Sequence, residues 1–255
     1  MKIVGIVPAR MAASRFPGKP LYSICGMPMV EHVYRRAAKF ENWDGLFIAT
    51  CDKEIMDVGL EKGFPSLMTS DKHTRALDRV AEAAEICGLN LSDNDVVVCV
   101  QGDEPMMHPD MISAVIEPLE KDSNVNCTVL AMEIKEEGIW VNPDTVKIIH
   151  DIKGDVLYTS RAPVPYCKQF PPKNYIPRRI YGIFAFRWHF LKTFTQTQQS
   201  PLEIVESCDS NRIFDNGFRQ RIAPYNYRPS FSVDNPADIK IVEKYIRDDS
   251  LWGTY

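Results

Sequence analysis

The sequence of 255 residues contains no C-x-x-C pair and no tight grouping of cysteine with histidine. Its seven cysteines are scattered along the chain and odd in number. Because of this pattern, we expect neither a zinc site nor a disulfide framework. We therefore expect free structural thiols in a cytoplasmic protein.

Long apolar runs and an overall excess of positive charge are also missing. No stretch approaches the ~18 apolar residues of a membrane span, and Pro8 and Arg10 interrupt the first apolar run. The 30 basic residues are outnumbered by 34 acidic ones, and the formal net charge is −4. We expect neither a membrane nor a nucleic acid as partner. Residues 1–40 hold seven basic residues and one acidic residue, so a local anion site is expected near the N-terminus.

Segments typical of strands and of helices alternate through the first half of the chain. We expect strands at 2–7, 46–50 and 96–100 and helices at 29–40, 52–62, 78–87 and 109–120. The alternation predicts βαβ units and a mostly parallel sheet. After about residue 125, strands expected at 127–134, 146–151, 155–160 and 179–186 have few helices between them, which favours mixed or antiparallel pairing. The aromatic residues of 181–190 are expected in a core strand, and 166–177 in a loop. We therefore expect one α/β domain with a smaller mixed β/α sub-domain.

The Walker A and G-x-G-x-x-G phosphate-binding patterns are absent, but a basic loop follows the first expected strand. Residues 8–21, PARMAASRFPGKPL, carry Arg10, Arg15 and Lys19. Ligands of open parallel sheets bind at the carboxyl ends of the strands. Three cations there suit a triphosphate. The alternative is a solvated basic loop with no ligand.

Two acidic motifs follow other expected strands. The first, QGDEP at 101–105, would place Asp103 at the tip of a strand, where it could hold Mg²⁺ that bridges phosphates. The second lies near the C-terminus, where we expect Asp234 to end a short strand and Asn235 and Pro236 to begin the final helix. Two carboxylates plus phosphates are a usual set of magnesium ligands. The alternative at both positions is an aspartate that only caps the next helix.

Six motifs in the same order make the chain resemble the CMP-Kdo synthetases (3-deoxy-manno-octulosonate cytidylyltransferases). They read VPARMAASRFPGKPL at 7–21, VQGDEP at 100–105, NPDTVK at 142–147, LYTSRAPVP at 157–165, SPLE at 200–203 and VDNPAD at 233–238. The resemblance implies a Rossmann-like nucleotide-diphospho-sugar transferase fold and a homodimer. It also implies transfer of CMP from CTP to a small anionic acceptor, with release of pyrophosphate. The expected acceptor is a 2-keto sugar acid such as Kdo, used in lipopolysaccharide biosynthesis.

The same resemblance assigns roles to individual residues. It implies that Arg10, Lys19 and Asp103 are catalytic, and that Asp103 and Asp234 hold Mg²⁺ or Mn²⁺. The nucleotide would contact Pro8, Ala9, Arg10, Arg15, Lys19, Arg75, Arg79 and Gln101. The acceptor would contact Gln101, Arg161, Glu203 and Glu206. A single domain, 1–255, would comprise a nucleotide-binding part of about 1–125 with the Asp234 region, and an acceptor-binding and dimerisation part of about 126–225.

The chain departs from the family pattern in two places. Arg75-Ala76-Leu77 stands where the family has Ser-Gly-Thr beside the nucleotide, and Ile180 and Phe184 stand for a histidine and a tyrosine on the acceptor side. These changes favour, first, an altered acceptor, which is either another 2-keto sugar acid or a metabolite that carries a phosphate, phosphoramidate or phosphonate, used in capsule modification. The second alternative is a nucleotide other than CTP. Ordinary sequence drift in an enzyme that keeps the same substrate would explain these changes equally well. A non-catalytic nucleotide- or sugar-acid-binding protein is the third alternative, and the presence of Lys19, Asp103 and Asp234 argues against it.

Overall fold

The computed structural model describes residues 1–12 and 15–255, so Ala13 and Ser14 of the first motif lie outside the described residues. The chain divides into two compact units. Unit 1 combines Met1–Ser113 with Pro229–Tyr255, and unit 2 is Ala114–Arg228. The chain passes from the first unit to the second within helix α4 (Pro109–Lys121).

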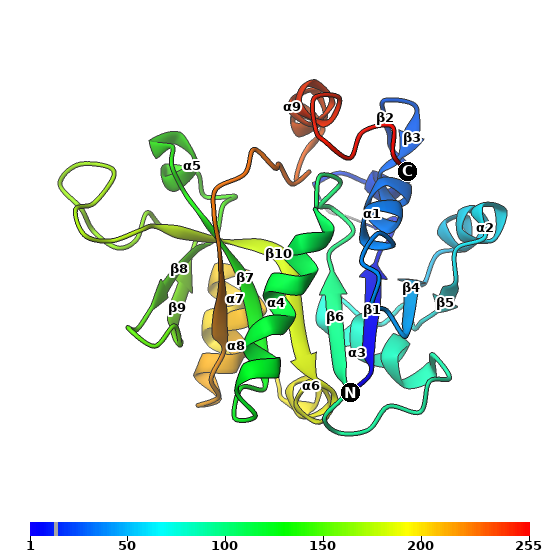
Figure 1. Ribbon diagram of the computed structural model, residues 1–255, viewed down its shortest axis with the longest axis horizontal. Helices are drawn as coiled ribbons and strands as arrows, with labels where there is room; N and C mark the ends of the chain where they lie inside the picture. Colours follow the sequence, from blue (N-terminus) through cyan, green and yellow to red (C-terminus); the bar gives the residue numbers. More distant parts are fainter. Residues whose placement is uncertain (13–14) are drawn as a thin grey trace. The chain divides into compact units, whose positions relative to one another are not determined.

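Unit 1 is built on a parallel sheet with strand order β6-β1-β4-β5 (Figure 1). The strands are β1 (Ile3–Pro8), β4 (Gly45–Thr50), β5 (Ser66–Met68) and β6 (Val96–Val100). Every residue of β6 is buried, as continuous apolar strands of parallel sheets are. Parallel pairing of β1 with both β4 and β6 confirms the expected βαβ architecture.

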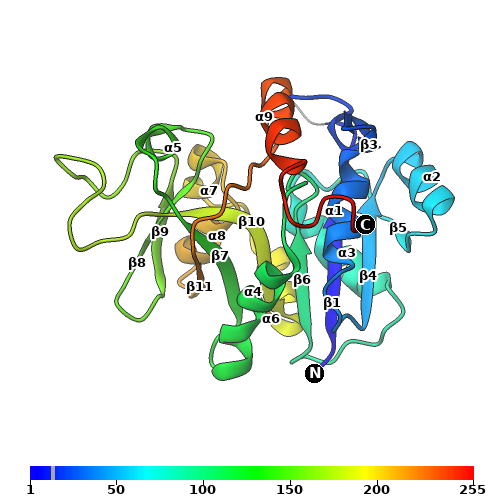
Figure 2. The same cartoon turned by 45° about the horizontal axis from the view of Figure 1, so that its top comes forward.

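The helices of unit 1 connect and cover these strands. They are α1 (Met29–Ala37), α2 (Lys53–Lys62), α3 (Ala76–Ile86) and α9 (Pro236–Ile246). Helices α1 and α3 pack against β1, and α2 packs against β4 and β5 (Figure 2). A 3₁₀ turn, η1 (Lys19–Leu21), and a small hairpin of β2 (Ser23–Ile24) and β3 (Met27–Pro28) lie between β1 and α1 in the sequence.

One apolar cluster of unit 1 joins the three segments that carry the predicted nucleotide site. Phe16 comes from the basic loop, Met106 follows QGDEP, and Val233 precedes Asp234. Their side chains are 8%, 1% and 0% exposed and pack with Ile239 of α9. Because burying each such side chain contributes about 1.5–3 kcal/mol, the cluster holds segments together that are far apart in the sequence.

Unit 2 has a mixed sheet with three strands in the order β11-β7-β10, and β8 and β9 continue it from β10. Its strands are β7 (Cys127–Glu133), β8 (Lys147–His150), β9 (Val156–Ser160), β10 (Arg178–Arg187) and β11 (Arg221–Tyr225). Strand β7 pairs antiparallel with β10 and parallel with β11, so the expected mixed pairing is confirmed. Its helices are α5 (Glu137–Val141), α6 (Trp188–Gln196), α7 (Pro201–Glu206) and α8 (Ser210–Asp215), of which α7 and α8 lie side by side (Figure 1).

Two local expectations are wrong. The aromatic stretch does not continue as a strand to Phe190, because β10 ends at Arg187 and Trp188 begins α6. Asp234 does not end a strand either, since no ladder forms over residues 229–234. The core position of Val233 fixes that segment instead. Within the described ranges, no helix has both the length and the apolar composition that crossing a bilayer requires.

Candidate functional site

The basic loop and the QGDEP turn begin next to each other in unit 1. Strands β1 and β6 pair in parallel with Ile6 beside Cys99, so both end at the same edge of the sheet. Gly102 approaches β1 so closely that an added Cβ would lie 2.6 Å from the carbonyl oxygen of Pro8. Only glycine fits such a close approach without moving the backbone.

Lys19 connects the basic loop to both acidic motifs. It follows Gly18, whose φ of 76° lies in the left-handed region that favours glycine. The Lys19 Nζ donates hydrogen bonds to Oδ2 of Asp103 at 3.0 Å and to the carbonyl oxygen of Val233 at 2.8 Å. The Lys19 and Asp103 side chains are 14% and 28% exposed, so this ion pair is partly shielded from water.

A second ion pair joins Arg15 to Asp234. The Arg15 guanidinium lies 2.7 Å from Oδ1 of Asp234, and the two side chains are 50% and 27% exposed. The backbone N–H of Val233 donates to the carbonyl oxygen of Asp103 at 2.9 Å, which ties the two acidic segments together. Four residues predicted from the sequence thus lie together as one candidate site: Arg15, Lys19, Asp103 and Asp234.

The two carboxylate oxygens of Asp103 differ in their contacts. Its Oδ1 is buried and has no hydrogen-bond partner among the residues described, whereas Oδ2 accepts from Lys19. An unpartnered buried oxygen costs free energy unless a ligand satisfies it. No cluster of three or more His, Cys, Asp or Glu side chains in the described ranges could hold a metal alone. Two carboxylates completed by phosphate and water oxygens are nevertheless a normal Mg²⁺ shell, so the residues present fit this ion.

The start of the basic loop is fixed by backbone contacts. Pro8 ends β1, and the Ala9 N–H donates to the carbonyl oxygen of Ala49 in β4 at 2.9 Å. Arg10 is half-buried and makes no hydrogen bond or ion pair with the described part of the chain. Its charge is therefore available to an anion at this edge of the sheet. Gln101, the last of the predicted contacts here, directly follows β6.

Asp52 is an anchor of this loop that the sequence analysis does not single out. Its Oδ2 accepts a hydrogen bond from the Met11 N–H at 2.7 Å, and the Met11 carbonyl accepts from the Gly18 N–H at 2.9 Å. Asp52 follows β4, the strand that pairs with β1. An acidic residue just beyond a neighbouring parallel strand is the signal that could have found it.

The structure gives Arg79 an internal role within unit 1. Its side chain is 2% exposed and donates to the Thr69 hydroxyl, to the backbone carbonyls of Ser70 and His73, and to the Cys51 sulfur. Arg79 therefore holds the segment between β5 and α3 in place. Arg75, at the N-cap position of α3, is half-buried. Their contacts with a nucleotide stay predictions.

In unit 2, hydrogen bonds join Glu206 and Arg161. The Glu206 carboxylate accepts from the Tyr158 hydroxyl at 2.8 Å, the Ser160 hydroxyl at 2.7 Å and the Arg161 N–H at 2.8 Å. Burial alone would raise the pKa of the Glu206 carboxyl, but these hydrogen bonds bring the pKa below its ordinary value. The Arg161 guanidinium donates to the carbonyl oxygens of Pro143 and Glu206 at 2.9 and 2.7 Å.

Glu203, the third residue predicted to contact the acceptor, is fully buried. Its two carboxylate oxygens each lie 2.7 Å from the Arg212 guanidinium. It also completes a capping box with Ser200 at the start of α7. Glu203 thus stabilises the α7–α8 pair, and its contact with an acceptor stays a prediction.

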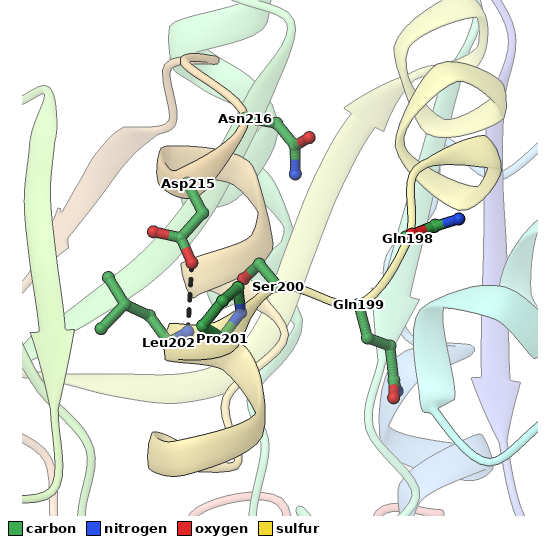
Figure 3. Close-up of a pocket in the computed structure, with 7 residues that line it drawn as sticks. All are labelled: Gln198, Gln199, Ser200, Pro201, Leu202, Asp215 and Asn216. Carbon is green, nitrogen blue, oxygen red and sulfur yellow. Dashed lines mark hydrogen bonds between the residues drawn. The ribbon is translucent and has the colours of Figure 1, made fainter.

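A pocket of about 430 Å³ lies elsewhere in unit 2, at the start of α7 and the end of α8 (Figure 3). The residues that line it are Gln198, Gln199, Ser200, Pro201, Leu202, Asp215 and Asn216. The Asp215 carboxylate points to the Leu202 N–H and accepts its hydrogen bond at 3.1 Å. None of these lining residues was predicted as a site residue.

Comparisons with known proteins agree with the motif content. A family model described as cytidylyltransferase matches residues 4–222. The chain is similar to the 3-deoxy-manno-octulosonate cytidylyltransferase of Nitratidesulfovibrio vulgaris (strain DP4), with 39% identity over 247 residues and 96% of both chains covered. It is 36% identical over 252 residues to the enzyme of the same name from Thermodesulfovibrio yellowstonii, covering 96% of this chain and 98% of that one.

A solved structure has the same fold. It is the CMP:2-keto-3-deoxy-manno-octonic acid synthetase complexed with CTP, which matches with a TM-score of 0.86 and 29% identity. The match covers 97% of this chain and 99% of that chain. The expected nucleotide-diphospho-sugar transferase type of α/β fold is thereby confirmed.

Proposed function

The chain belongs to the cytidylyltransferase family, and we propose that it transfers CMP from CTP to 3-deoxy-manno-octulosonate (Kdo), releasing pyrophosphate. The observation that carries the proposal is the joining of two cations and two carboxylates by the Lys19–Asp103 and Arg15–Asp234 ion pairs. A triphosphate with its metal needs both kinds of group in one place. Likeness to a synthetase in complex with CTP supports the choice of nucleotide.

In this proposal the cations bind and orient the triphosphate. Lys19 and Arg15 are held at the edge of the parallel sheet, and the half-buried Arg10 adds a third charge. Their task is to hold the α-phosphorus in line with the attacking oxygen of the acceptor and to neutralise charge as pyrophosphate leaves. Neither step needs a covalent nucleophile on the protein.

The proposed cofactor is Mg²⁺, with Mn²⁺ as a substitute. Asp103 would hold it through the buried Oδ1, and Asp234 would supply the second carboxylate. When bound, the ion neutralises charge on the phosphate oxygens. Because Lys19 and Arg15 already pair with these carboxylates, they also reduce the repulsion between the two acids.

Kdo is the proposed acceptor because curated relatives that are 36–39% identical over nearly the whole chain carry this activity in their names. Phe184, one of the two departures on the acceptor side, is 4% exposed and stacks on Phe186 within unit 2. Leu77, in the changed nucleotide segment, is 1% exposed. Core packing explains both apolar residues without a change of substrate.

The proposal extends to the pathway, the oligomeric state and the cellular compartment. The product would feed lipopolysaccharide biosynthesis, with capsule modification as the alternative if the acceptor carries phosphate or phosphonate. The oligomer would be a homodimer, which light scattering of the purified chain tests. The compartment would be the cytoplasm, because all seven cysteines are free thiols.

The test is pyrophosphate release from CTP and Mg²⁺ with a panel of acceptors. Kdo is expected to give the highest kcat/KM, above N-acetylneuraminate and above small phosphonates. Turnover with a phosphonate but not with Kdo would contradict the proposed acceptor. Asp103→Asn should abolish release while leaving the far-UV circular dichroism spectrum unchanged. Release with none of the acceptors, by a protein that still binds CTP, would favour a binding protein instead.

A further inference from the structure

Asp238, in the first turn of α9, makes more contacts than helix capping requires. Its Oδ2 accepts one hydrogen bond from the N–H of Asn235, the N-cap residue, at 2.9 Å. This bond is the usual second half of a capping box. The same oxygen accepts a second hydrogen bond, at 2.8 Å, from the N–H of Asp234.

The second bond acts on the residue proposed to hold the metal. Just before it, Val233 is fully buried, and its N–H donates to the carbonyl oxygen of Asp103 at 2.9 Å. Just after it, Asn235 has its own N–H on Asp238. Three consecutive backbone N–H groups are thus held, and the direction in which the Asp234 side chain leaves the backbone is fixed.

The Asp238 carboxylate can sit beside Asp234 because its charge is compensated. Two backbone N–H groups donate to it, and it lies at the positive end of the dipole of α9, a helix of 11 residues. The Asp234 carboxylate is paired with Arg15 at 2.7 Å. The two acids therefore have separate partners.

We propose that Asp238 is a positioning residue, which orients Asp234 toward the metal and triphosphate by accepting its backbone N–H. This inference rests on the proposed function, in which Asp234 is a metal ligand. Sequence alone does not separate this role from plain helix capping. The hydrogen bond to the Asp234 N–H does.

The chain offers a matched control in the other half of the same capping box. The Asn235 side chain accepts from the Ala237 N–H at 3.0 Å, whereas the Asp234 N–H donates to Asp238. Asn235→Ala therefore removes a helix cap without releasing Asp234. Asp238→Ala removes a cap and releases Asp234, whereas Asp238→Asn keeps an oxygen that can accept both hydrogen bonds.

The experiment measures binding of Mn²⁺ to the full chain in the presence of CTP and without acceptor, from the electron paramagnetic resonance signal of free Mn²⁺. Asp238→Ala is expected to raise the Kd for Mn²⁺ about tenfold, since misplaced groups bind less well. Asn235→Ala should change the Kd less than twofold and lower the Tm by a similar amount to Asp238→Ala. Asp238→Asn should restore most of the affinity.

The controls separate the inference from the proposed function. If Asp234→Asn leaves the Kd for Mn²⁺ unchanged, Asp234 is not a metal ligand, and the inference fails together with that assignment. If Asp234→Asn weakens binding but Asp238→Ala does not, or if Asn235→Ala weakens it equally, only the inference fails. An Asp238→Asn variant as impaired as Asp238→Ala also overturns it, because the acceptor oxygen would then not be what matters.

Discussion

Lys19 is the residue on which the candidate site depends most. Its ammonium group contacts Asp103 and the carbonyl oxygen of Val233, so one side chain joins three separate segments of the chain. Its partner Asp103 has a further buried oxygen without a hydrogen-bond partner in the described ranges. The charge of Lys19 therefore holds the candidate site together, and in the proposed function it would also pair with a triphosphate.

Lys19→Met should lower kcat/KM for CTP by about 10²–10³-fold, as loss of one group that stabilises transition-state charge does. Steady-state pyrophosphate release measures the effect. Lys53→Met is the matched control, because Lys53 pairs with Asp57 on the exposed face of α2. Such surface pairs contribute little, so the control should behave as wild type. Equal effects of the two substitutions would remove Lys19 from the catalytic machinery.

At the residue scale, the charged residues of the candidate site could be predicted from the sequence. The partners of other charged side chains could not. Arg15, Lys19, Asp103 and Asp234 were recognisable because each follows or precedes a strand or helix signal in an ordered motif. From the sequence alone, Glu203 could not be distinguished from an acidic residue that binds a ligand. Its partner Arg212 lies nine residues away, in a segment where no helix is expected. A bidentate ion pair depends on tertiary packing, which no local pattern encodes.

At the scale of elements, the basic loop after β1 is held by Asp52, which lies just after the end of β4. Asp52 accepts from the Met11 N–H, and the carbonyl of Met11 closes the loop onto Gly18. Asp52 makes no side-chain capping bond to α2, although it stands at the N-cap position. Its hydrogen bond therefore serves the loop rather than the helix.

Asp52→Ala should raise the KM for CTP about tenfold with a smaller effect on kcat, because the cations of the loop lose their fixed position. Initial rates over a range of CTP concentrations and a thermal melt measure both properties. The Tm should stay near the wild-type value, since no helix cap is lost. Asp57→Ala, on the exposed face of the same helix, is the control. A wild-type KM in Asp52→Ala would show that the loop keeps its shape without this bond.

Elements with strong local signals were predictable, and those without were not. Helix α2 has its expected end at Gly63, which has a φ of 71°, and α9 has its expected start at Asn235. Helix α7 was missed although Ser200 and Glu203 form a capping box, because the helix is only six residues long. Strand β11 was missed because Pro224 argues against a strand, and its parallel pairing with β7 is a long-range contact.

At the scale of the whole molecule, the last residues of the sequence return to the first helix. Unit 1 includes residues 229–255, and within it Asp249 pairs with Arg36 of α1 at 3.1 Å. The Arg36 side chain is fully buried, and its Nε also donates to the Tyr255 hydroxyl at 3.0 Å. Composition gave no sign of this arrangement, because a buried arginine and a surface arginine look alike in sequence.

The Asp249–Arg36 pair should make part of the stability of the molecule dependent on pH. Burial by itself would raise the pKa of the Asp249 carboxyl, but hydrogen bonds from His108 and the Leu251 N–H, with the charge of Arg36, lower its pKa from 3.8 to about 2. A carboxyl whose pKa is lowered on folding stabilises the folded state at neutral pH, and loses this contribution as pH falls from about 4 toward 2. The shift corresponds to about 2 kcal/mol.

Asp249→Asn should therefore reduce the free energy of unfolding by about 3 kcal/mol at pH 7, because it leaves the buried Arg36 cation without its counter-ion. The difference from wild type should shrink by about 2 kcal/mol as the pH is lowered through 4 toward 2. Urea denaturation at a series of pH values measures it. Asp248→Asn, at the exposed neighbouring residue, should show a small difference that does not depend on pH. A constant difference for Asp249→Asn across this range would mean that the pair is not what anchors the end of the chain to α1.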